Sequence, residues 1–180
     1  DCLATLAGAI ERHPECELAT SALMCIDEKG HELPDPFEGQ WLQACLGDLM
    51  QKEHVRSRPC GGVLHATGRS VNVSLTQLLV RRRLFDRIGL FRTDFGPVAD
   101  FEWNMRAGLL ANTVYVPRKL ATWRRHGAQA TGRKVTAEYW RVQNAMIAQA
   151  VRAARAIDAN ALPAGVSARQ LQTMTEYRRL

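Results

Sequence analysis

The sequence predicts an α/β fold in which a partial mixed β-sheet with flanking helices is followed by a helical C-terminal tail. Its 180 residues, 46% of them hydrophobic, suit a single core. Apolar runs of strand length alternate with segments of helical periodicity through the first part of the chain, whereas the last part is rich in alanine. This change in character predicts a first domain at 1–131 and a helical extension at 132–180.

The chain should open with a helix that is followed by a strand. Residues 1–12 present one apolar helical face, and His13-Pro14 ends it. The run Leu18–Ile26 is almost continuously apolar and has the length of a buried strand, and Asp27–Gly30 has the composition of a turn. The predicted apolar face of the helix comprises Leu3, Leu6 and Ile10.

The next region should hold a helix and a loop. Apolar residues recur at helical spacing over 37–49. The segment Arg56–Arg69 is basic and rich in glycine, which favours an irregular, mobile loop. It matches neither G-x-x-x-x-G-K-[ST] nor G-x-G-x-x-G, the glycine patterns that bind phosphate groups. We expect His65, within this segment, to be a surface or hydrogen-bonding residue rather than a ligand.

A strand and a short helix should follow. Val71–Val80 alternates and then becomes apolar, as expected for a strand that enters the core. Leu84, Phe85 and Ile88 predict a helical turn that Gly89 closes. In the preceding run of three arginines, at 81–83, the second and third are interpreted as solvated side chains.

A helix–strand pair is predicted next. Phe101, Met105, Leu109 and Leu110 recur at near-helical spacing, with Pro97 upstream and Asn112 where a left-handed cap would fit. Thr113–Val116 is β-branched or aromatic throughout and should be a strand that Pro117 stops. The acids Asp100 and Glu102 fall in the first helical turn, where the helix dipole favours an ionised carboxylate.

The C-terminal extension should be helical. Residues 135–161 carry one apolar stripe, for which packing on the core is the usual explanation and a partner helix the alternative. Leu162–Gly165 breaks this helix, and Ser167 is expected to cap a last short one. The stripe consists of Tyr139, Val142, Met146, Ala150, Ala153 and Ile157.

Charge is unevenly distributed along the chain. Residues 1–53 hold 3 basic and 11 acidic side chains, net −8, whereas 54–180 hold 21 basic and 7 acidic, net +14. The basic part would attract a diphosphate, an anionic lipid surface or nucleic acid. The alternatives are that the two parts complement each other, or that the arginine excess, 20 of 24 basic residues, reflects codon bias on a solvated surface. Aromatic residues are thinly interleaved with the basic ones, so no specific nucleic-acid partner is predicted.

The number and spacing of the cysteines and the hydropathy of the chain indicate the cellular compartment of the protein. The five cysteines are odd in number and lack C-x-x-C spacing, which favours neither a disulfide framework nor a thiolate zinc site. No apolar run approaches the roughly 20 residues of a membrane-spanning helix, and no signal-peptide pattern opens the chain. These features predict a cytoplasmic protein.

Four elements carry a family resemblance, in the order Leu78–Arg82 with Phe85–Phe91, Asp100–Arg106, Tyr115–Pro117 and Arg124–Gly127. In this order and spacing they resemble the C-terminal half of a family 2 glycosyltransferase with the GT-A fold. The resemblance covers roughly Leu3 to Thr131. The nucleotide-binding half of that fold, with its metal-binding D-x-D motif, would precede Asp1, and the chain itself contains no D-x-D.

The resemblance implies inverting transfer of a sugar from a nucleotide-diphosphate sugar to a glycan or lipid-linked acceptor, as in the synthesis of cell envelope polysaccharides. Asp100 falls on the family's general base, which deprotonates the acceptor hydroxyl, although Ala99 replaces the glutamate that commonly precedes it. Glu102 is a second candidate. The remaining site residues are Arg124 and Arg125, whose charge would stabilise the leaving diphosphate, and His126, which matches a ligand of Mn²⁺ or Mg²⁺ in some members.

The alternative is a non-catalytic, truncated transferase module that binds a partner protein or an anionic polymer. A D-x-D in an upstream partner or in a longer parent would favour the enzyme. A truncated sheet would expose an edge strand, which predicts a homodimer. A lipid-linked acceptor would bring the protein to the inner face of the membrane as a peripheral protein.

Overall fold

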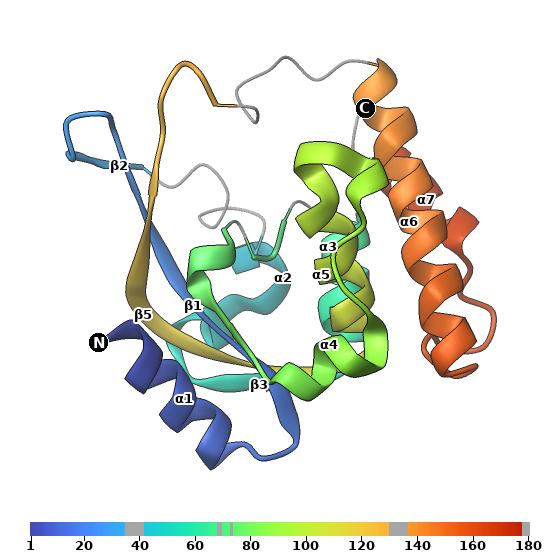
Figure 1. Ribbon diagram of the computed structural model, residues 1–180, viewed down its shortest axis with the longest axis horizontal. Coiled ribbons are helices and arrows are strands. Elements are labelled where there is room, and N and C mark those ends of the chain that lie inside the picture. The colour runs from blue at the N-terminus through green and yellow to red at the C-terminus, as the bar shows by residue number, and fades with distance from the viewer. Residues whose placement is uncertain (35–41, 68–69, 73, 130–136, 178–180) are drawn as a thin grey trace.

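The computed structural model confirms an α/β fold with a mixed, open sheet of five strands, flanking helices and a helical C-terminal part (Figure 1). The strands are β1 (Cys16–Ile26), β2 (Glu32–Leu33), β3 (His54–Arg56), β4 (Leu78–Val80) and β5 (Asn112–Arg124). The helices are α1 (Cys2–Arg12), α2 (Gln43–Leu46), α3 (Cys60–Thr67), α4 (Arg82–Ile88), α5 (Ala99–Leu110), α6 (Ala137–Ile157) and α7 (Ala168–Tyr177). Short 3-10 helices are η2 (Gly47–Gln51), η3 (Leu75–Gln77) and η4 (Thr93–Val98). The structure describes residues 1–34, 42–67, 70–72, 74–129 and 137–177.

The sheet is built around the parallel pair β1 and β5. Its order is β2-β1-β5-β3, and β4 also pairs with β1; the pairings other than β1–β5 are antiparallel. The parallel register runs from Cys16 beside Asn112 to Ile26 beside Arg124. The carboxyl ends of β1 and β5 therefore lie at the same edge of the sheet.

Helices cover both faces of this sheet. On one face α1 packs Leu6 and Ile10 against Val114 and Val116. On the other, α3, α4 and α5 lie against the sheet, and α6 and α7 form an outer layer (Figure 1). Most of β1 and the first half of β5 are therefore buried, whereas β5 beyond Val116 is partly exposed.

The opening helix is as predicted except for one side chain. Asp1 caps α1, since its carboxylate accepts a hydrogen bond from the N–H of Leu3 at 3.0 Å. Leu6 and Ile10 are buried, but Leu3 is 65% exposed and Ala9 takes its place in the core. The turn that follows β1 is also confirmed, because the Asp27 carboxylate accepts from two backbone N–H groups of the turn.

The mobile loop predicted at Arg56–Arg69 is wrong, because residues 60–67 form helix α3. Gly61 and Gly62 lie against Gly108 of α5, and a Cβ atom on Gly62 would come within 2.5 Å of the Leu109 nitrogen. Two helices approach this closely only where side chains are missing. The glycines therefore serve packing between α3 and α5.

Two further element predictions need correction. The strand predicted from Val71 is restricted to β4, because Ser74 and Gln77 exchange hydrogen bonds in a capping box that starts η3. Within the described residues, the helix predicted over 37–49 is divided into α2 and η2, because Gly47 ends α2 with a φ of 52°. Phe37 and Trp41 of its predicted face lie outside the described residues.

Strand β5 continues past Pro117, so the prediction that this proline stops the strand is wrong. Ser21 of β1 pairs with Val116, and the next residue, Ala22, pairs with Lys119. This register shift places the proline in a bulge, where its missing N–H costs no ladder hydrogen bond. Asn112 begins β5 and is not a left-handed cap, since the described part of the chain has no positive φ outside glycine.

The C-terminal helices share a core with the rest of the chain. Met146, Ile147 and Ala150 of α6 belong to the same buried cluster as Leu109 of α5. The predicted stripe is only partly correct, because its first and last members, Tyr139 and Ile157, are exposed. Ser167 caps α7 as predicted, by accepting from the N–H of Gln170 at 3.3 Å. The predicted boundary at 131/132 lies outside the described residues.

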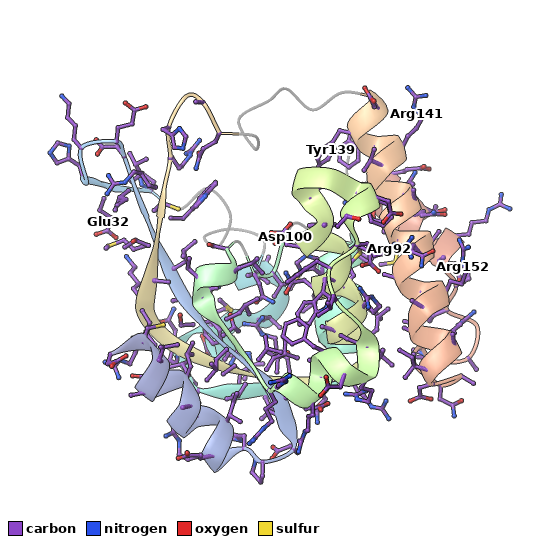
Figure 2. All side chains as sticks on the ribbon, in the orientation of Figure 1. Glu32, Arg92, Asp100, Tyr139, Arg141 and Arg152 are labelled. Atoms are coloured by element: carbon purple, nitrogen blue, oxygen red, sulfur yellow. The ribbon has the colours of Figure 1, made fainter. Side chains whose placement is uncertain are left out.

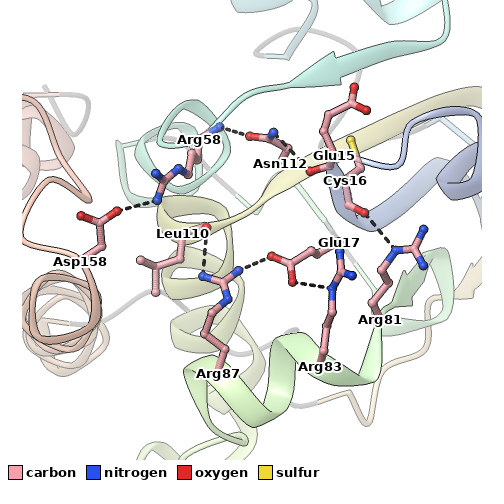
Figure 3. Close-up of polar contacts among 10 residues, drawn as sticks. All are labelled: Glu15, Cys16, Glu17, Arg58, Arg81, Arg83, Arg87, Leu110, Asn112 and Asp158. Carbon is pink, nitrogen blue, oxygen red and sulfur yellow. Dashed lines mark hydrogen bonds and ion pairs between the residues drawn. The ribbon is translucent and has the colours of Figure 1, made fainter.

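Arginines around α4 bind the amino-terminal end of β1 (Figure 3). Arg81 donates to the carbonyl oxygens of Cys16 and Ile10, each at 3.2 Å. Arg83 donates to the Glu17 carboxylate at 3.2 Å, and Arg87 forms an ion pair with the same carboxylate. The interpretation of Arg82 and Arg83 as solvated side chains is confirmed, since both are exposed, and Arg83 in addition forms a surface ion pair with Glu17.

Candidate functional site

Helix α5 carries both candidate acids in its first turn. No side chain caps this helix: the residue at the cap position is Val98, and Gly96, with a φ of 57°, interrupts η4 just before it. Figure 2 shows Asp100 toward the middle of the molecule. The first turn is therefore held by contacts from other parts of the fold.

The Asp100 carboxylate is half-buried and has no cationic partner among the described residues. Burial raises the pKa of Asp100, and hydrogen bonds from the backbone N–H groups of Phe101 and of Asp100 itself oppose this shift. A carboxylate that is partly removed from water and carries no ion pair keeps its capacity to accept a proton. This is the chemistry that the predicted role requires.

Glu102 has entirely different surroundings. It is 0% exposed, and Nε and Nη2 of Arg106 each donate to one of its carboxylate oxygens at 3.0 Å. Arg106 also donates to the carbonyl oxygens of Ile88 and Leu90, at the end of α4 and just after it. Both oxygens of Glu102 are therefore engaged in a buried ion pair that fixes the chain after α4. This arrangement does not favour Glu102 as a proton acceptor.

Sequence reasoning missed the polar residues that contact this turn. Asn104 lies one turn after Asp100, and its Nδ2 donates to the Asp100 carbonyl oxygen at 2.9 Å. Its Oδ1 accepts from Nδ2 of Asn72 at 3.1 Å. The four-residue spacing of Asp100 and Asn104 is a signal that the sequence contains. The contact with Asn72 has no such signal, because 32 positions separate the two asparagines.

His65 of α3 packs against the same turn. Its ring centroid lies 4.4 Å from that of Phe101, and its Nδ1 accepts from the N–H of Val71 at 3.2 Å. The prediction of a hydrogen-bonding histidine is confirmed, although the side chain is buried and not at the surface. Burial lowers the pKa of His65 to about 3, so the imidazole is neutral at physiological pH.

The end of β5 carries the predicted diphosphate-binding arginines. Nη1 of Arg124 donates to the carbonyl oxygens of Asp27 and Glu28, each at 3.0 Å, and so holds the turn after β1. Arg125 is exposed, and its guanidinium carbon lies 6.0 Å from the centroid of the Trp123 ring. Both charges lie at the edge where the parallel strands end. Open α/β sheets generally bind ligands at this edge.

The residues around His126 do not fit the predicted metal. His126 is exposed, and its backbone N–H donates to the Gln129 side chain at 3.2 Å. Mn²⁺ and Mg²⁺ need several oxygen ligands besides an imidazole. Within the described ranges no three His, Cys, Asp or Glu side chains are grouped to hold a metal ion. We therefore derive no catalytic step through a metal.

The two parts of the predicted site are not in contact. In the described part of the chain, no hydrogen bond or ion pair joins Asp100 to Arg124, Arg125 or His126. A donor and an acceptor substrate would have to occupy the space between a base and a diphosphate-binding group. Direct contact is thus not required by the predicted chemistry.

Comparisons with known proteins add no relative: no family model, no curated protein and no solved structure matches this chain. The α/β class and the mixed five-stranded sheet are what the structure establishes. The relation to glycosyltransferases rests on the sequence resemblance and is a proposal. No described helix has the length and apolar character needed to cross a membrane.

Proposed function

We propose that this chain is the acceptor-side part of an inverting glycosyltransferase of the family 2 type, with Asp100 as its general base. The observation that carries the proposal is the half-buried Asp100 carboxylate in the first turn of α5, which pairs with no described Arg, Lys or His. Two residues away, Glu102 is bound on both oxygens by Arg106. Of the two candidate acids, only Asp100 keeps a carboxylate that is not already held by a cation.

In the proposed reaction, Asp100 accepts the proton of an acceptor hydroxyl while that oxygen attacks the anomeric carbon of the donor sugar. The bond from this carbon to the diphosphate oxygen breaks, and the electron pair leaves with the diphosphate. Attack from the opposite side inverts the configuration. Arg125, exposed at the end of β5, supplies positive charge to the leaving group, and Arg124 adds charge while it holds the turn after β1.

The variant Asp100→Asn, made in an intact enzyme that includes the nucleotide-binding half, tests the proposal, because an amide cannot accept the proton. We expect transfer from sugar nucleotides, followed as release of the nucleoside diphosphate with glycan and lipid-linked acceptors, to fall by about 10²- to 10⁴-fold. Donor binding, measured by calorimetry with UDP, should stay unchanged. In the wild type, turnover should fall on acidification through a pKa above that of an ordinary aspartate, because burial raises the pKa of Asp100.

Asp94→Asn is a matched control, since Asp94 is an exposed acid in η4 that pairs with Arg92 at 2.8 Å. Its turnover should stay within about twofold of the wild type, as for most surface substitutions. Full turnover in the Asp100→Asn variant would overturn the assignment of the base. Absence of transfer from any sugar nucleotide by the intact wild type, with its nucleotide-binding half present, would count against the enzyme and favour a binding module.

A further inference from the structure

A directed chain of side-chain hydrogen bonds connects the sheet to the first turn of α5. It begins at Gln77, whose Nε2 donates to the Ser21 carbonyl oxygen at 2.8 Å and to the Thr20 hydroxyl at 3.3 Å. The Thr20 hydroxyl donates to Oδ1 of Asn72 at 3.1 Å. Asn72 then donates to Asn104, so each group accepts from one neighbour and donates to the next.

The chain ends at the residue that bears the proposed base. Nδ2 of Asn104 donates to the carbonyl oxygen of Asp100 at 2.9 Å. Thr20, Gln77 and Asn104 are all buried, where an unmade hydrogen bond is costly. The link is therefore held in one arrangement.

The anchor of this chain lies in a strand that is paired on both sides. Thr20 lies in β1 and pairs with Tyr115 of β5 on one side and with Leu78 of β4 on the other. In contrast, the start of α5 has no side-chain cap and follows the kink at Gly96. Besides the packing of His65 on Phe101 and the Glu102–Arg106 pair, the two asparagine amides tie this turn to β1.

We propose that Asn72 and Asn104 are positioning residues, which hold the Asp100 carboxylate at a fixed place relative to the sheet. The inference rests on the proposed function, since it assigns these amides a role toward the proposed base. Neither side chain needs to touch a substrate. The catalytic group would be correctly placed because its helix turn is tied to the strand pair at whose carboxyl edge the donor is proposed to bind.

The test is the titration of Asp100 in the full chain by carboxyl ¹³C NMR, with Asp100→Asn used to assign the resonance. In Asn72→Ala and in Asn104→Ala the first turn loses its tie to β1 and opens to water. We expect the pKa of Asp100 to move toward that of an ordinary aspartate in both variants. Where transfer is measured, kcat should fall by roughly tenfold or more at an unchanged donor KM, because misplacement of a base affects the chemical step.

Asn144→Ala is the matched control, because Asn144 is also a helical asparagine with a side-chain partner, Glu176 at 3.2 Å, but lies in α6. It should leave the Asp100 titration unchanged. If the two alanine variants do not fold, Thr20→Val removes the hydroxyl at nearly constant shape and should shift the titration in the same direction. An Asp100 titration identical to the wild type in the folded variants would overturn the inference.

These outcomes are separate from those of the proposed function. The NMR titration needs no substrate, so a shifted pKa of Asp100 in the variants supports the positioning role whether or not transfer is detected. If Asp100→Asn abolishes transfer but the titration does not respond to Asn72 or Asn104, the positioning inference alone fails. If the titration responds and Asp100→Asn retains full transfer, the assignment of Asp100 as the base fails.

Discussion

Asp100 and Glu102 lie in the same helical turn, but they differ in burial and in ion pairing. Glu102 lies in the core and depends on Arg106 for its charge, so loss of either partner would leave a buried charge uncompensated. Asp100 is half-buried and has no described cationic partner, and burial raises its pKa. The structural acid Glu102 thus has an ion-pair partner and the candidate base Asp100 has none among the described residues, although only two positions separate them in the sequence.

At the scale of single residues, His65 should make stability depend on pH. Its folded pKa of about 3 lies below the unfolded value of roughly 6.5, so the unfolded chain binds more protons between these values. This contribution is fully present above pH 6.5 and is lost as the pH falls toward the folded pKa. Relative to His65→Gln, the wild type should lose about 1.4 kcal/mol of unfolding free energy per pH unit in this window.

Urea unfolding of both proteins at pH 7 and at pH 5 would measure this difference. Glutamine is chosen because it does not titrate and its side-chain oxygen can replace Nδ1 as the acceptor for the N–H of Val71. Equal pH slopes for the wild type and the variant would show that His65 is protonated as readily in the folded state as in the unfolded chain.

At the scale of elements, helices α3 and α5 pack closely because glycines place no side chain between them. A Cβ atom on Gly108 would lie 2.4 Å from the Gly62 nitrogen and 2.7 Å from the Gly61 carbonyl carbon, both of which are backbone atoms. Helix propensity alone would favour Gly108→Ala by about 1 kcal/mol. The backbone clash outweighs this gain, because neither helix can move away without opening the core.

We therefore expect Gly108→Ala to lower the free energy of unfolding by at least about 2 kcal/mol, measured by denaturant titration. Gly127→Ala is the control: a Cβ atom on Gly127 would meet no atom within 4 Å, and the φ of this residue is not positive. It should change stability by less than about 0.5 kcal/mol. Equal stability of the two variants would show that α3 moves away from α5 at little cost.

At the scale of the whole molecule, the acidic N-terminal part and the basic remainder are joined by ion pairs. Glu17 of β1 binds Arg83 and Arg87 of α4, and Glu32 of β2 binds Lys119 of β5 (Figure 3 shows the Glu17 pairs). Charge complementarity within the chain thus accounts for part of the sequence asymmetry. Other arginines, such as Arg141 and Arg152 on α6, are exposed (Figure 2).

The shared core predicts that the C-terminal helices unfold together with the sheet. Ile147 of α6 is 0% exposed and belongs to the cluster that contains Leu109 of α5. Ile147→Ala should cost about 2–5 kcal/mol and lower the midpoint of one single transition. The readouts are circular dichroism and amide exchange of residues in both α5 and α6.

Ile157→Ala makes the same chemical change in the same helix at a position that is 43% exposed. Its cost should be well under that of Ile147→Ala, because little apolar surface is removed from a packed interior. Loss of α6 in a separate, earlier transition, with protection of α5 unchanged, would mean that the C-terminal helices form an independent unit.

Several elements are specified by local interactions and could therefore be predicted from the sequence. The turn after β1, the end of α4 at Gly89 and the cap at Ser167 all depend on atoms within a few residues of each other. The alternation of apolar, strand-length runs with segments of helical periodicity likewise predicts the α/β class, because the residues buried on one face of a strand or helix recur at the period of that element. For the candidate site, the same local reasoning predicts the first turn of α5 and its two acids.

Tertiary contacts decided the rest. Segment 60–67 is a helix whose glycines allow close packing on Gly108, and β5 passes Pro117 through a bulge in its pairing with β1. The separate roles of Asp100 and Glu102, and the tie from Thr20 to Asn104, arise between groups far apart in sequence. Such contacts lower the free energy only when the chain has already brought distant segments together, so neither composition nor periodicity records them.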